Sequence, residues 1–488
     1  MPATTSLPCY TACDLTEAGR QLTAPFTLDI APALNAWQCQ QILRLLPQKR
    51  LVLKLQNGDE QAILKLFFRA KDYQREIDGW QLLQQAELPT ADIIAHHAQD
   101  DLQYILFQCI DGQSLAHHWQ QQGGKQQQID LLLRALPTLA QMHRAGLIQA
   151  DIHLDNFLLH QNQLILIDYA SIKQGDKPLK PALAQHNLAF LLAQLPSYYA
   201  RFYPQIVNQY ILNASDQDYA KAINIPDLTA QVSSLREKRW LHFEKKIARD
   251  CSEFIALQSF SERTVIRRDC HSPAMMALLD NPDLAIADGH YLKQGNSATV
   301  SLISIDNQAY VIKRYNIKGF VHGIKRALRV TRAWSSWRSG YKLIFEGLTT
   351  PLPVAIKEQR IGVIRRQAYL ICRAVDGKDL WQVYNDGEAC PVDKTVLDQQ
   401  VIALFEAMLS SRVSHGDFKG TNLIVTAEGL NVIDLDAMTL HNDDKSLKKA
   451  LKKDLARFIR NFEPVQQQHF ELLLSDFSGK LDESSIAG

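Results

Sequence analysis

The alternation of apolar and polar residues predicts two strands joined by a tight turn near the start of the chain. Residues 50–68 hold two apolar runs on either side of Asn57-Gly58, a pattern typical of a β-hairpin, and Lys65 then falls on the second strand. Residues 72–86 carry apolar side chains at helical spacing, with Glu76 near the start. A hairpin followed by a helix therefore opens the patterned part of the chain.

The rest of the first half continues as a mixture of strands and helices. Apolar residues predict a buried strand at 104–110, helices at 131–144 and 185–192, and one long charged helix at 228–254. The Gln- and Gly-rich segment 120–128 is typical of a loop.

The second half repeats this order of elements. A turn that contains Gly295 lies within 292–300, a strand at 310–313 ends in Lys313, and another strand follows at 369–372. We interpret the repetition as an internal duplication.

The spacing of polar residues supports the duplication. Three pairs are each separated by 266 residues, namely Asp151 and Asp417, Asn156 and Asn422, and Asp168 and Asp434. A single pair of acidic residues can match by chance, but three pairs with the same separation are not expected by chance. We therefore predict an α+β chain of two tandem domains, at residues 1–255 and 256–488.

Composition adds little about partners. The 488 residues carry 53 basic and 52 acidic side chains, a net charge of +1, so overall charge favours no class of partner. The first residues lack the pattern of a secretory signal, and no apolar run approaches the roughly 18 residues needed to span a bilayer. The eight cysteines include no C-x-x-C pair, which indicates reduced thiols in a cytoplasmic protein.

One segment of the second half concentrates residues suited to phosphoryl transfer. Asp417 is a candidate catalytic base for an attacking hydroxyl, and Lys419, two residues later, is placed to neutralise phosphate charge. Asn422 and Asp434 are the expected Mg²⁺ ligands. The whole pattern, with His415 before the base, favours two bilobal, protein-kinase-like domains over a structural polar turn.

The candidate ATP clamp lies upstream of this segment. Gly295 sits where a kinase covers the phosphates with a hairpin, although one glycine stands there instead of three. Lys313 is predicted to contact the ATP phosphates; a surface lysine on an edge strand is the alternative.

The first half carries an altered copy of the same set. Lys65 and Glu76 are the expected strand lysine and its helix partner, Asp151 is the candidate catalytic residue, and Asn156 and Asp168 are the candidate metal ligands. Glutamine replaces the histidine before the aspartate, histidine replaces the lysine after it, and no glycine-bearing loop precedes the strand lysine. This half either binds nucleotide poorly, uses a different substrate, or is a degenerate structural copy.

Two basic segments are candidates for contact with an anionic partner. Residues 313–342 hold nine Lys or Arg residues and no Asp or Glu, with Trp334 and Trp337 among them, which favours contact with an anionic membrane surface or a phosphorylated substrate. In 445–460 basic residues surround a Leu and Phe stripe, and we interpret this as a core-facing helix with solvated lysines. No motif for nucleic acid is present, so none is expected as a partner.

The second half resembles the bacterial lipopolysaccharide core kinases, which include Kdo kinases, heptose kinases of the WaaP type and InaA-like proteins. The resemblance spans most of 288–460 and is carried by Leu292-Lys293-x-Gly295-x-x-Ala298-Thr299-Val300, Ser336-Trp337-Arg338, Thr350-Pro351, His415-Gly416-Asp417-x-Lys419-x-Thr421-Asn422 and Asp434-Leu435-Asp436. It implies a protein-kinase-like fold and ATP and Mg²⁺ as cofactors. The implied partner is a lipopolysaccharide core precursor at the cytoplasmic face of the inner membrane, phosphorylated on a sugar hydroxyl. The first half resembles a more remote member, with an Asp-x-His-x-x-Asn loop also similar to aminoglycoside phosphotransferases.

One position departs from the family pattern. Alignment of the two halves places Ser336 opposite Glu76, so the second copy lacks a helix acid to pair with Lys313. Glu346 lies a helical turn out of register and is not expected to substitute. How Lys313 is held is therefore open.

A peptide acceptor is disfavoured by length. Only 20 residues separate Asp434 from Asp454, which leaves little room for an activation loop, and no Ala-Pro-Glu is present. The leading prediction is an ATP-dependent phosphotransferase, active in its C-terminal half, that phosphorylates a Kdo or heptose hydroxyl of the lipopolysaccharide inner core. The alternatives are a tandem pseudokinase scaffold for lipopolysaccharide or envelope assembly, and a kinase of a small metabolite or a protein.

Overall fold

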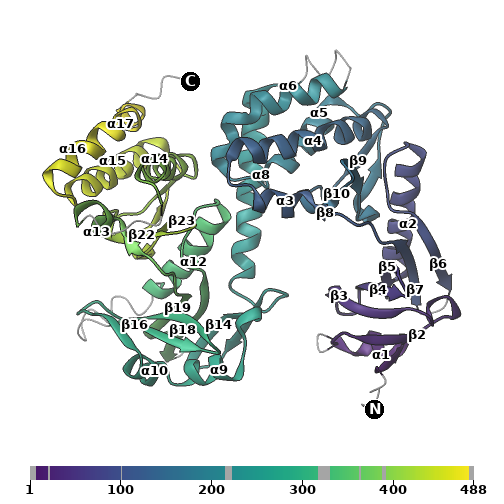
Figure 1. The fold of residues 1–488 in the computed structure, drawn as a ribbon, viewed down its shortest axis with the longest axis horizontal. Helices are drawn as coiled ribbons and strands as arrows, with labels where there is room; N and C mark the ends of the chain where they lie inside the picture. Colours follow the sequence, from purple (N-terminus) through teal and green to yellow (C-terminus); the bar gives the residue numbers. More distant parts are fainter. Residues whose placement is uncertain are drawn as a thin grey trace. The chain divides into compact units, whose positions relative to one another are not determined.

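The computed structural model describes residues 7–19, 22–99, 102–214, 223–316, 330–361, 364–386 and 392–482. The chain divides into two compact units (Figure 1). The N-terminal unit comprises Met1–Gln194 and Ala200–Ser233, and the C-terminal unit comprises Leu195–Tyr199 and Ser234–Gly488. Both mix antiparallel sheets with helices, which confirms the predicted α+β class.

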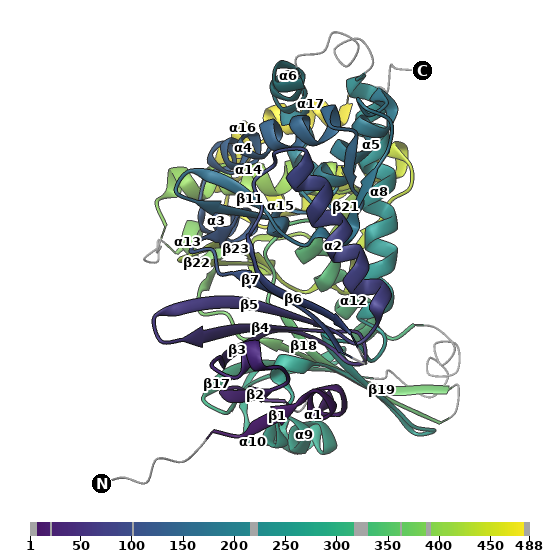
Figure 2. The ribbon, with the colours of Figure 1, turned by 90° about the vertical axis from the view of Figure 1, so that its right-hand side faces the viewer.

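The large sheet of the N-terminal unit has seven strands in the order β1-β2-β3-β4-β5-β7-β6 (Figure 2). Of the strand pairs described in this sheet, β1–β2 is parallel and the others are antiparallel. The predicted hairpin is β4–β5, and Lys65 lies between Val52 and Ile105 of the neighbouring strands. The strands are β1 (Cys9–Thr11), β2 (Phe26–Asp29), β3 (Gln38–Leu46), β4 (Arg50–Asn57), β5 (Glu60–Phe67), β6 (Ile93–Gln99) and β7 (Leu102–Gln108).

The large sheet of the C-terminal unit is antiparallel, in the order β13-β14-β18-β19-β17-β16-β15. Its strands are β13 (Phe254–Gln258), β14 (Glu262–Arg267), β15 (His290–Gln294), β16 (Ala298–Ile305), β17 (Gln308–Tyr315), β18 (Pro353–Ile361) and β19 (Ile364–Arg373). Five strands correspond in order between the units, since β3-β4-β5-β7-β6 matches β15-β16-β17-β19-β18. The two additional strands lie beside β3 in one unit and beside β18 in the other, so the shared sheet is extended at opposite edges.

A helix follows the lysine-bearing strand in each unit. These helices are α2 (Ala70–Gln85) and α12 (Arg332–Phe345). Each buries one face: α2 buries Glu76 among apolar residues, and α12 buries Ser336 beside Trp337. Residues 317–329 of the predicted basic segment lie outside the described residues.

The helical part of the N-terminal unit contains α3 (Leu115–Gln121), α4 (Lys125–Arg144), α5 (Pro181–Leu192) and α6 (Tyr203–Ala214), with the short strands β8 (Gln113–Ser114), β9 (Leu147–Gln149), β10 (Phe157–His160), β11 (Gln163–Leu166) and β12 (Ile172–Gln174). The predicted loop at 120–128 is wrong, because residues 120–121 and 125–128 are helical and only Gln122–Gly124 separates α3 from α4. The charged helix predicted at 228–254 is α8 (Ile225–Lys246), which ends before β13.

The helical part of the C-terminal unit contains α13 (Leu380–Asn385), α14 (Lys394–Ser410), α15 (Asp444–Arg460), α16 (Pro464–Leu473) and α17 (Ser475–Asp482), with the short strands β20 (Lys378–Asp379), β21 (Val413–Ser414), β22 (Leu423–Thr426), β23 (Gly429–Val432) and β24 (Thr439–Leu440). The short sheets repeat those of the first unit, as Leu158 pairs with Ser114 and Ile424 with Asp379. The remaining described helices are α1 (Ala12–Glu17), α9 (Pro273–Asp280) and α10 (Pro282–Asp288).

Helix α15 packs its apolar stripe into the core of the C-terminal unit. Its buried apolar residues are Leu447, Leu451, Leu455 and Phe458. Lys449, Lys452 and Lys453 are exposed, so the core-facing interpretation of 445–460 is confirmed. No described helix combines the length and apolar character needed to cross a bilayer.

Candidate active site

The loop between β21 and β22 carries Asp417, and a buried histidine fixes its backbone. The His415 Nε2 atom lies 2.9 Å from the Ile433 carbonyl, and its Nδ1 atom accepts the Asp417 backbone N–H at 3.3 Å. One ring nitrogen donates and the other accepts, so the bonded imidazole is neutral. Burial lowers the pKa of His415 and favours the same form.

Asp454 of α15 holds the same loop from the other side. Its carboxylate accepts the backbone N–H of His415 at 2.7 Å and of Gly416 at 3.0 Å. Gly416 has φ 82°, and a Cβ atom there would lie 2.6 Å from the Ala437 carbonyl oxygen. The close approach and the left-handed backbone both require glycine at this position.

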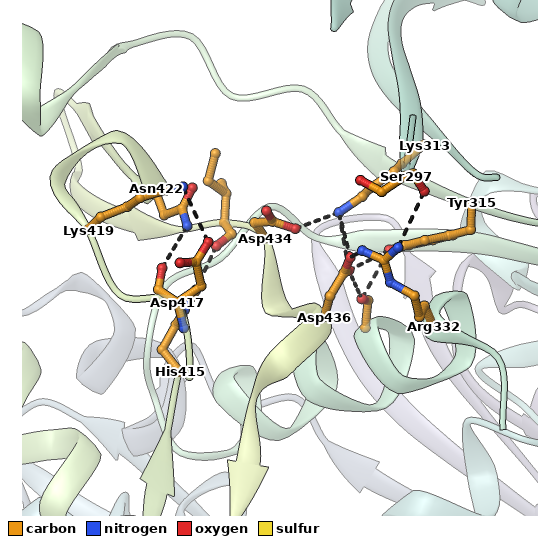
Figure 3. Close-up of polar contacts among 12 residues, drawn as sticks. Ser297, Lys313, Tyr315, Arg332, His415, Asp417, Lys419, Asn422, Asp434 and Asp436 are labelled. Atoms are coloured by element: carbon orange, nitrogen blue, oxygen red, sulfur yellow. Dashed lines mark hydrogen bonds and ion pairs between the residues drawn. The ribbon is translucent and has the colours of Figure 1, made fainter. Parts of the chain in front are cut away.

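Asp417 lies in a basic setting at the surface of the C-terminal unit. Its side chain is 43% exposed, with the Lys419 Nζ atom at 3.2 Å and the Arg457 Nη1 atom at 3.4 Å. The Asn422 Nδ2 atom donates to the Asp417 carbonyl at 2.9 Å, which leaves the Asn422 amide oxygen to face a cation. The predicted base, lysine and amide therefore lie together (Figure 3).

Asp434 connects this group to the lysine of the large sheet. It follows β23 with a left-handed φ of 61°, and its Oδ1 atom lies 2.5 Å from Lys313 Nζ. Figure 3 shows Asp434 between the Asp417 group and the Lys313 group. The structure therefore brings the second-half candidates Lys313, Asp417, Asn422 and Asp434 into one site.

The donor set of this site fits Mg²⁺. Mg²⁺ is typically held by one or two carboxylates together with substrate phosphates and water, and Asp434 with the Asn422 amide oxygen supplies such a partial set. Within the described ranges there is no cluster of three or more His, Cys, Asp or Glu residues that could hold a metal ion. Substrate phosphates would therefore complete the coordination.

No helix acid pairs with Lys313 among the described residues, and Asp436 takes that place. Both Asp436 carboxylate oxygens lie 3.1 Å from Lys313 Nζ. The same carboxylate accepts from Ser336 at 2.6 Å, from Tyr315 at 2.8 Å and from Arg332. Burial alone would raise the pKa of Asp436, but Lys313, Ser336 and Arg332 hold it below its usual range. The acid thus comes from the loop after Asp434 instead of from the helix.

Sequence reasoning missed the role of Asp436, although a signal was present. Asp436 stands 266 residues after Ala170, so an acid appears in the second copy where the first has none. At the same time the helix position changes from Glu76 to Ser336. The two changes compensate each other, and an alignment of the halves shows both.

Glu346 has a different role, as the sequence indicated. Its buried carboxylate lies 2.7 Å from Lys342 Nζ and 2.6 Å from Arg236 Nη2, and it accepts from Ser197 at 2.6 Å. Burial alone would raise the pKa of Glu346, but Arg236 and Lys342 hold it below its usual range. This cluster braces α12 against α8 within the C-terminal unit.

Gly295 lies in the turn between β15 and β16. Its N–H donates to Ala298 at 3.1 Å and its carbonyl accepts from Asn316 at 2.9 Å. A Cβ atom at Gly295 would lie 3.4 Å from the nearest atom, an ordinary contact. The turn itself therefore does not require glycine. Arg332 donates to the Ser297 carbonyl at 3.3 Å and so joins this turn to Asp436.

The N-terminal unit pairs its strand lysine with the helix acid, as predicted. Lys65 Nζ contacts the Glu76 carboxylate, which is fully buried. The same carboxylate accepts the backbone N–H of Tyr169 at 3.3 Å and of Ala170 at 3.2 Å. Glu76 therefore joins the sheet lysine to the loop that follows Asp168.

Asp168 adopts the backbone conformation of Asp434 but contacts an additional cation. Its φ is 65°, and its Oδ1 atom lies 3.1 Å from Arg50 Nη1 and 3.8 Å from Lys65 Nζ. Burial alone would raise the pKa of Asp168, but Lys65 and Arg50 hold it below its usual range. Sequence reasoning assigned no role to Arg50.

The loop of the N-terminal unit keeps part of the second-unit geometry. The Asn156 Nδ2 atom donates to the Asp151 carbonyl at 2.9 Å, as Asn422 does to Asp417. Gln149 donates to the Asp168 carbonyl at 3.2 Å and to the Ile167 carbonyl at 3.5 Å, in the place of the histidine contact. In the part of the chain that the structure describes, the Asp151 carboxylate has no ion pair.

A buried histidine on α4 supports this loop. Asn187 donates to the Gln149 carbonyl at 2.9 Å and, through its own oxygen, contacts His143 Nε2 at 3.1 Å. His143 Nδ1 lies 2.7 Å from the Tyr210 hydroxyl. Burial lowers the pKa of His143 to about 4, so the imidazole is neutral at pH 7.

Comparisons with known proteins support the assignment of the second half. Residues 292–477 match the model of the lipopolysaccharide kinase (Kdo/WaaP) family. No curated protein matches the chain. The crystal structure of the kinase domain of Mycobacterium tuberculosis PknI is similar at 15% identity and a TM-score of 0.27, over 42% of this chain and 96% of that chain. We draw no conclusion from a likeness at that score. The matched residues 292–477 contain the whole site around Asp417, so this part of the chain is similar to the lipopolysaccharide kinase (Kdo/WaaP) family.

Proposed function

We propose that the C-terminal unit is an ATP-dependent kinase that phosphorylates a sugar hydroxyl, of Kdo or heptose, in the lipopolysaccharide inner core. The observation that carries the proposal is the meeting of Asp417, Asn422, Asp434 and Lys313 in one site. That site lies within the segment that matches a lipopolysaccharide kinase family.

In the proposed reaction Asp417 accepts the proton of the sugar hydroxyl as its oxygen attacks the γ-phosphorus of ATP. The bond from the γ-phosphorus to the bridging oxygen breaks, and ADP leaves. Lys419 and Arg457 flank Asp417 and neutralise charge on the transferred group. Asn422 and Asp434 would hold Mg²⁺, whose charge stabilises the phosphates when it is bound.

Lys313 and the Gly295 turn are the proposed clamp for the ATP phosphates. Lys313 now lies between Asp434 and Asp436, and Asp436 continues to orient it when phosphate oxygens compete for its charge. The space beside Gly295 has no side chain of its own, so a phosphate can approach the backbone of the turn.

The surroundings of Asp417 favour a small, anionic acceptor over a peptide. The carboxylate is open to solvent and lies between two basic side chains, which suits an acid sugar. Helix α15 begins at Asp444, so the connection from Asp434 is too short for a peptide-binding shelf. Binding of the basic segment 313–342 to the anionic cytoplasmic face of the inner membrane is part of the proposal.

The same substitution at equivalent positions of the two units tests the proposal. In full-length protein, Asp417→Asn is expected to lower ATP-dependent phosphate incorporation into core lipopolysaccharide by about 10³-fold or more, since it removes the base. Asp151→Asn is the matched control and is expected to keep activity. The readout is mass spectrometry of the core, with circular dichroism to show that both variants are folded.

The outcome also separates the alternatives. Wild-type turnover by Asp417→Asn together with loss in Asp151→Asn would assign activity to the N-terminal unit. Failure of full-length protein to show any Mg²⁺-dependent stabilisation by ATP in a thermal-shift titration would favour a tandem pseudokinase scaffold. If the protein turns over ATP but the core carries the same phosphates in strains with and without the chain, the acceptor is a metabolite or a protein.

A further inference from the structure

Arg50 occupies a defined position on the first strand of the shared hairpin. It pairs across β4–β5 with Phe67, two residues after Lys65. In the C-terminal unit Ala298 pairs with Tyr315, two residues after Lys313. Arg50 and Ala298 therefore hold the same place in the two sheets, and a guanidinium is present in only one of them.

The Arg50 guanidinium contacts the carboxylate expected to bind a metal ion. Its Nη1 atom lies 3.1 Å from Asp168 Oδ1 and 4.0 Å from Glu76 Oε2. The Arg50 side chain is only 15% exposed, so these two acids, more than water, compensate its positive charge. A divalent cation at Asp168 would have to displace the guanidinium and leave it poorly solvated, with only the more distant Glu76 of these two acids beside it.

The C-terminal unit has the same charges in a different arrangement. In each site the ion pairs join one lysine, one arginine and two acids. In the C-terminal unit Arg332 pairs with Asp436, the acid that holds the lysine, and not with Asp434. Among the described residues, Asp434 therefore forms an ion pair with Lys313 alone, and in the proposed reaction Lys313 contacts the ATP phosphates.

We propose that the Arg50 guanidinium takes the place of a divalent cation at Asp168, so that the N-terminal unit binds no divalent metal ion. The predicted metal ligands Asn156 and Asp168 do not fit Mg²⁺ in the presence of Arg50. All metal-dependent chemistry of the chain then belongs to the C-terminal unit. The proposal concerns the N-terminal unit alone and does not depend on which acceptor is phosphorylated.

Mn²⁺ binding in the presence of ADP, followed by electron paramagnetic resonance of free Mn²⁺, tests the proposal on full-length protein. Wild-type protein is expected to bind one Mn²⁺, and Asp434→Asn is expected to bind none. In the Asp434→Asn background, Arg50→Ala introduces the residue found at the equivalent position and is expected to create one site. Arg50→Lys in that background keeps a cation and is the matched control, expected to create none.

The result that overturns the proposal is a second Mn²⁺ in wild-type protein that is lost in Asp168→Asn. This comparison needs no change at Arg50 and so stands even if the Arg50→Ala variant fails to fold. A folded Arg50→Ala variant without a new site would also contradict the proposal. Absence of Mn²⁺ from wild-type protein together with a new site in the Arg50→Ala variant would support it, while counting against the proposed function of the C-terminal unit.

Discussion

The two units hold the strand lysine by acids from different elements. In the N-terminal unit the acid is Glu76 on a helix, and the loop after Asp168 donates backbone N–H groups to that acid. In the C-terminal unit the loop contributes Asp436, and the helix contributes the Ser336 hydroxyl and the Arg332 guanidinium but no acid. The acid is thus on the helix in one unit and on the loop in the other, and the groups that donate to it are on the opposite element. The left-handed aspartates at the start of both loops keep nearly the same φ. Duplicated sites can thus conserve a charge balance without conserving the residues that provide it.

The loops that carry Asp151 and Asp417 differ in the same manner. The first is held by neutral groups, through the series from His143 to Asn187 to the Gln149 carbonyl. The second is held by the charged carboxylate of Asp454, which accepts two backbone N–H groups. Hydrogen bonds to a charged acceptor are stronger than neutral ones, so the second loop is the more firmly fixed.

The largest effect in this comparison is expected from Asp436. The Asp436→Ala variant leaves Lys313 without its acid and is expected to lower kcat/KM for ATP by about 10²-fold. Adding Ser336→Glu rebuilds the helix acid of the N-terminal unit and is expected to recover part of that loss. Steady-state kinetics of both variants measures the effect.

Ser336→Glu alone is the control for this exchange, since it places two acids beside one lysine and is expected to lower activity. If Asp436→Ala retained the wild-type kcat/KM, Asp436 would not be the anchor. If the double variant were no better than the single one, the acids of the two units would not be interchangeable.

A smaller effect is expected from pH on the N-terminal unit. The folded pKa of His143 is about 4, below the unfolded value, so the unfolded chain binds more protons between these values. The stabilisation is complete above about pH 6.5 and is lost as pH falls toward 4; about 2 kcal/mol should disappear by pH 5. Urea unfolding between pH 7.5 and 5 measures it.

His143→Gln keeps a polar side chain that does not titrate and is the control for this pH dependence. The difference in unfolding free energy between wild type and variant should shrink as pH falls. A constant difference across the range would show that His143 does not titrate in the way its burial indicates.

The smallest effect on stability is expected from Gly295→Ala. A Cβ atom fits at this turn, so the free energy of unfolding should change by less than about 0.5 kcal/mol, while KM for ATP rises if phosphate approaches the backbone there. Gly416→Ala is the contrasting control, because a Cβ atom meets the Ala437 carbonyl and φ is positive. An unchanged KM for Gly295→Ala would remove the turn from the proposed clamp.

The sequence predicted the elements and the members of the second site well, because both depend on local patterns. Lys65, Glu76 and the hairpin could be placed by periodicity, and the 266-residue spacing brought Asp417, Asn422 and Asp434 together. The contacts of Asp436 and Arg50 depend on which strand faces which loop. One sequence alone does not reveal that arrangement, so both residues were assigned only from the structure.

The position of Asp436 has a consequence for how the proposed kinase could be controlled. Kinases that anchor the strand lysine to a helix acid can be switched off by moving that helix. In the C-terminal unit Asp436 and Asp434 belong to one short loop. An outward movement of α12 would therefore break the contacts of Ser336 and Arg332 with Asp436 but leave Asp436 beside Lys313. If the proposed function holds, movement of α12 alone is therefore not expected to separate Lys313 from its acid.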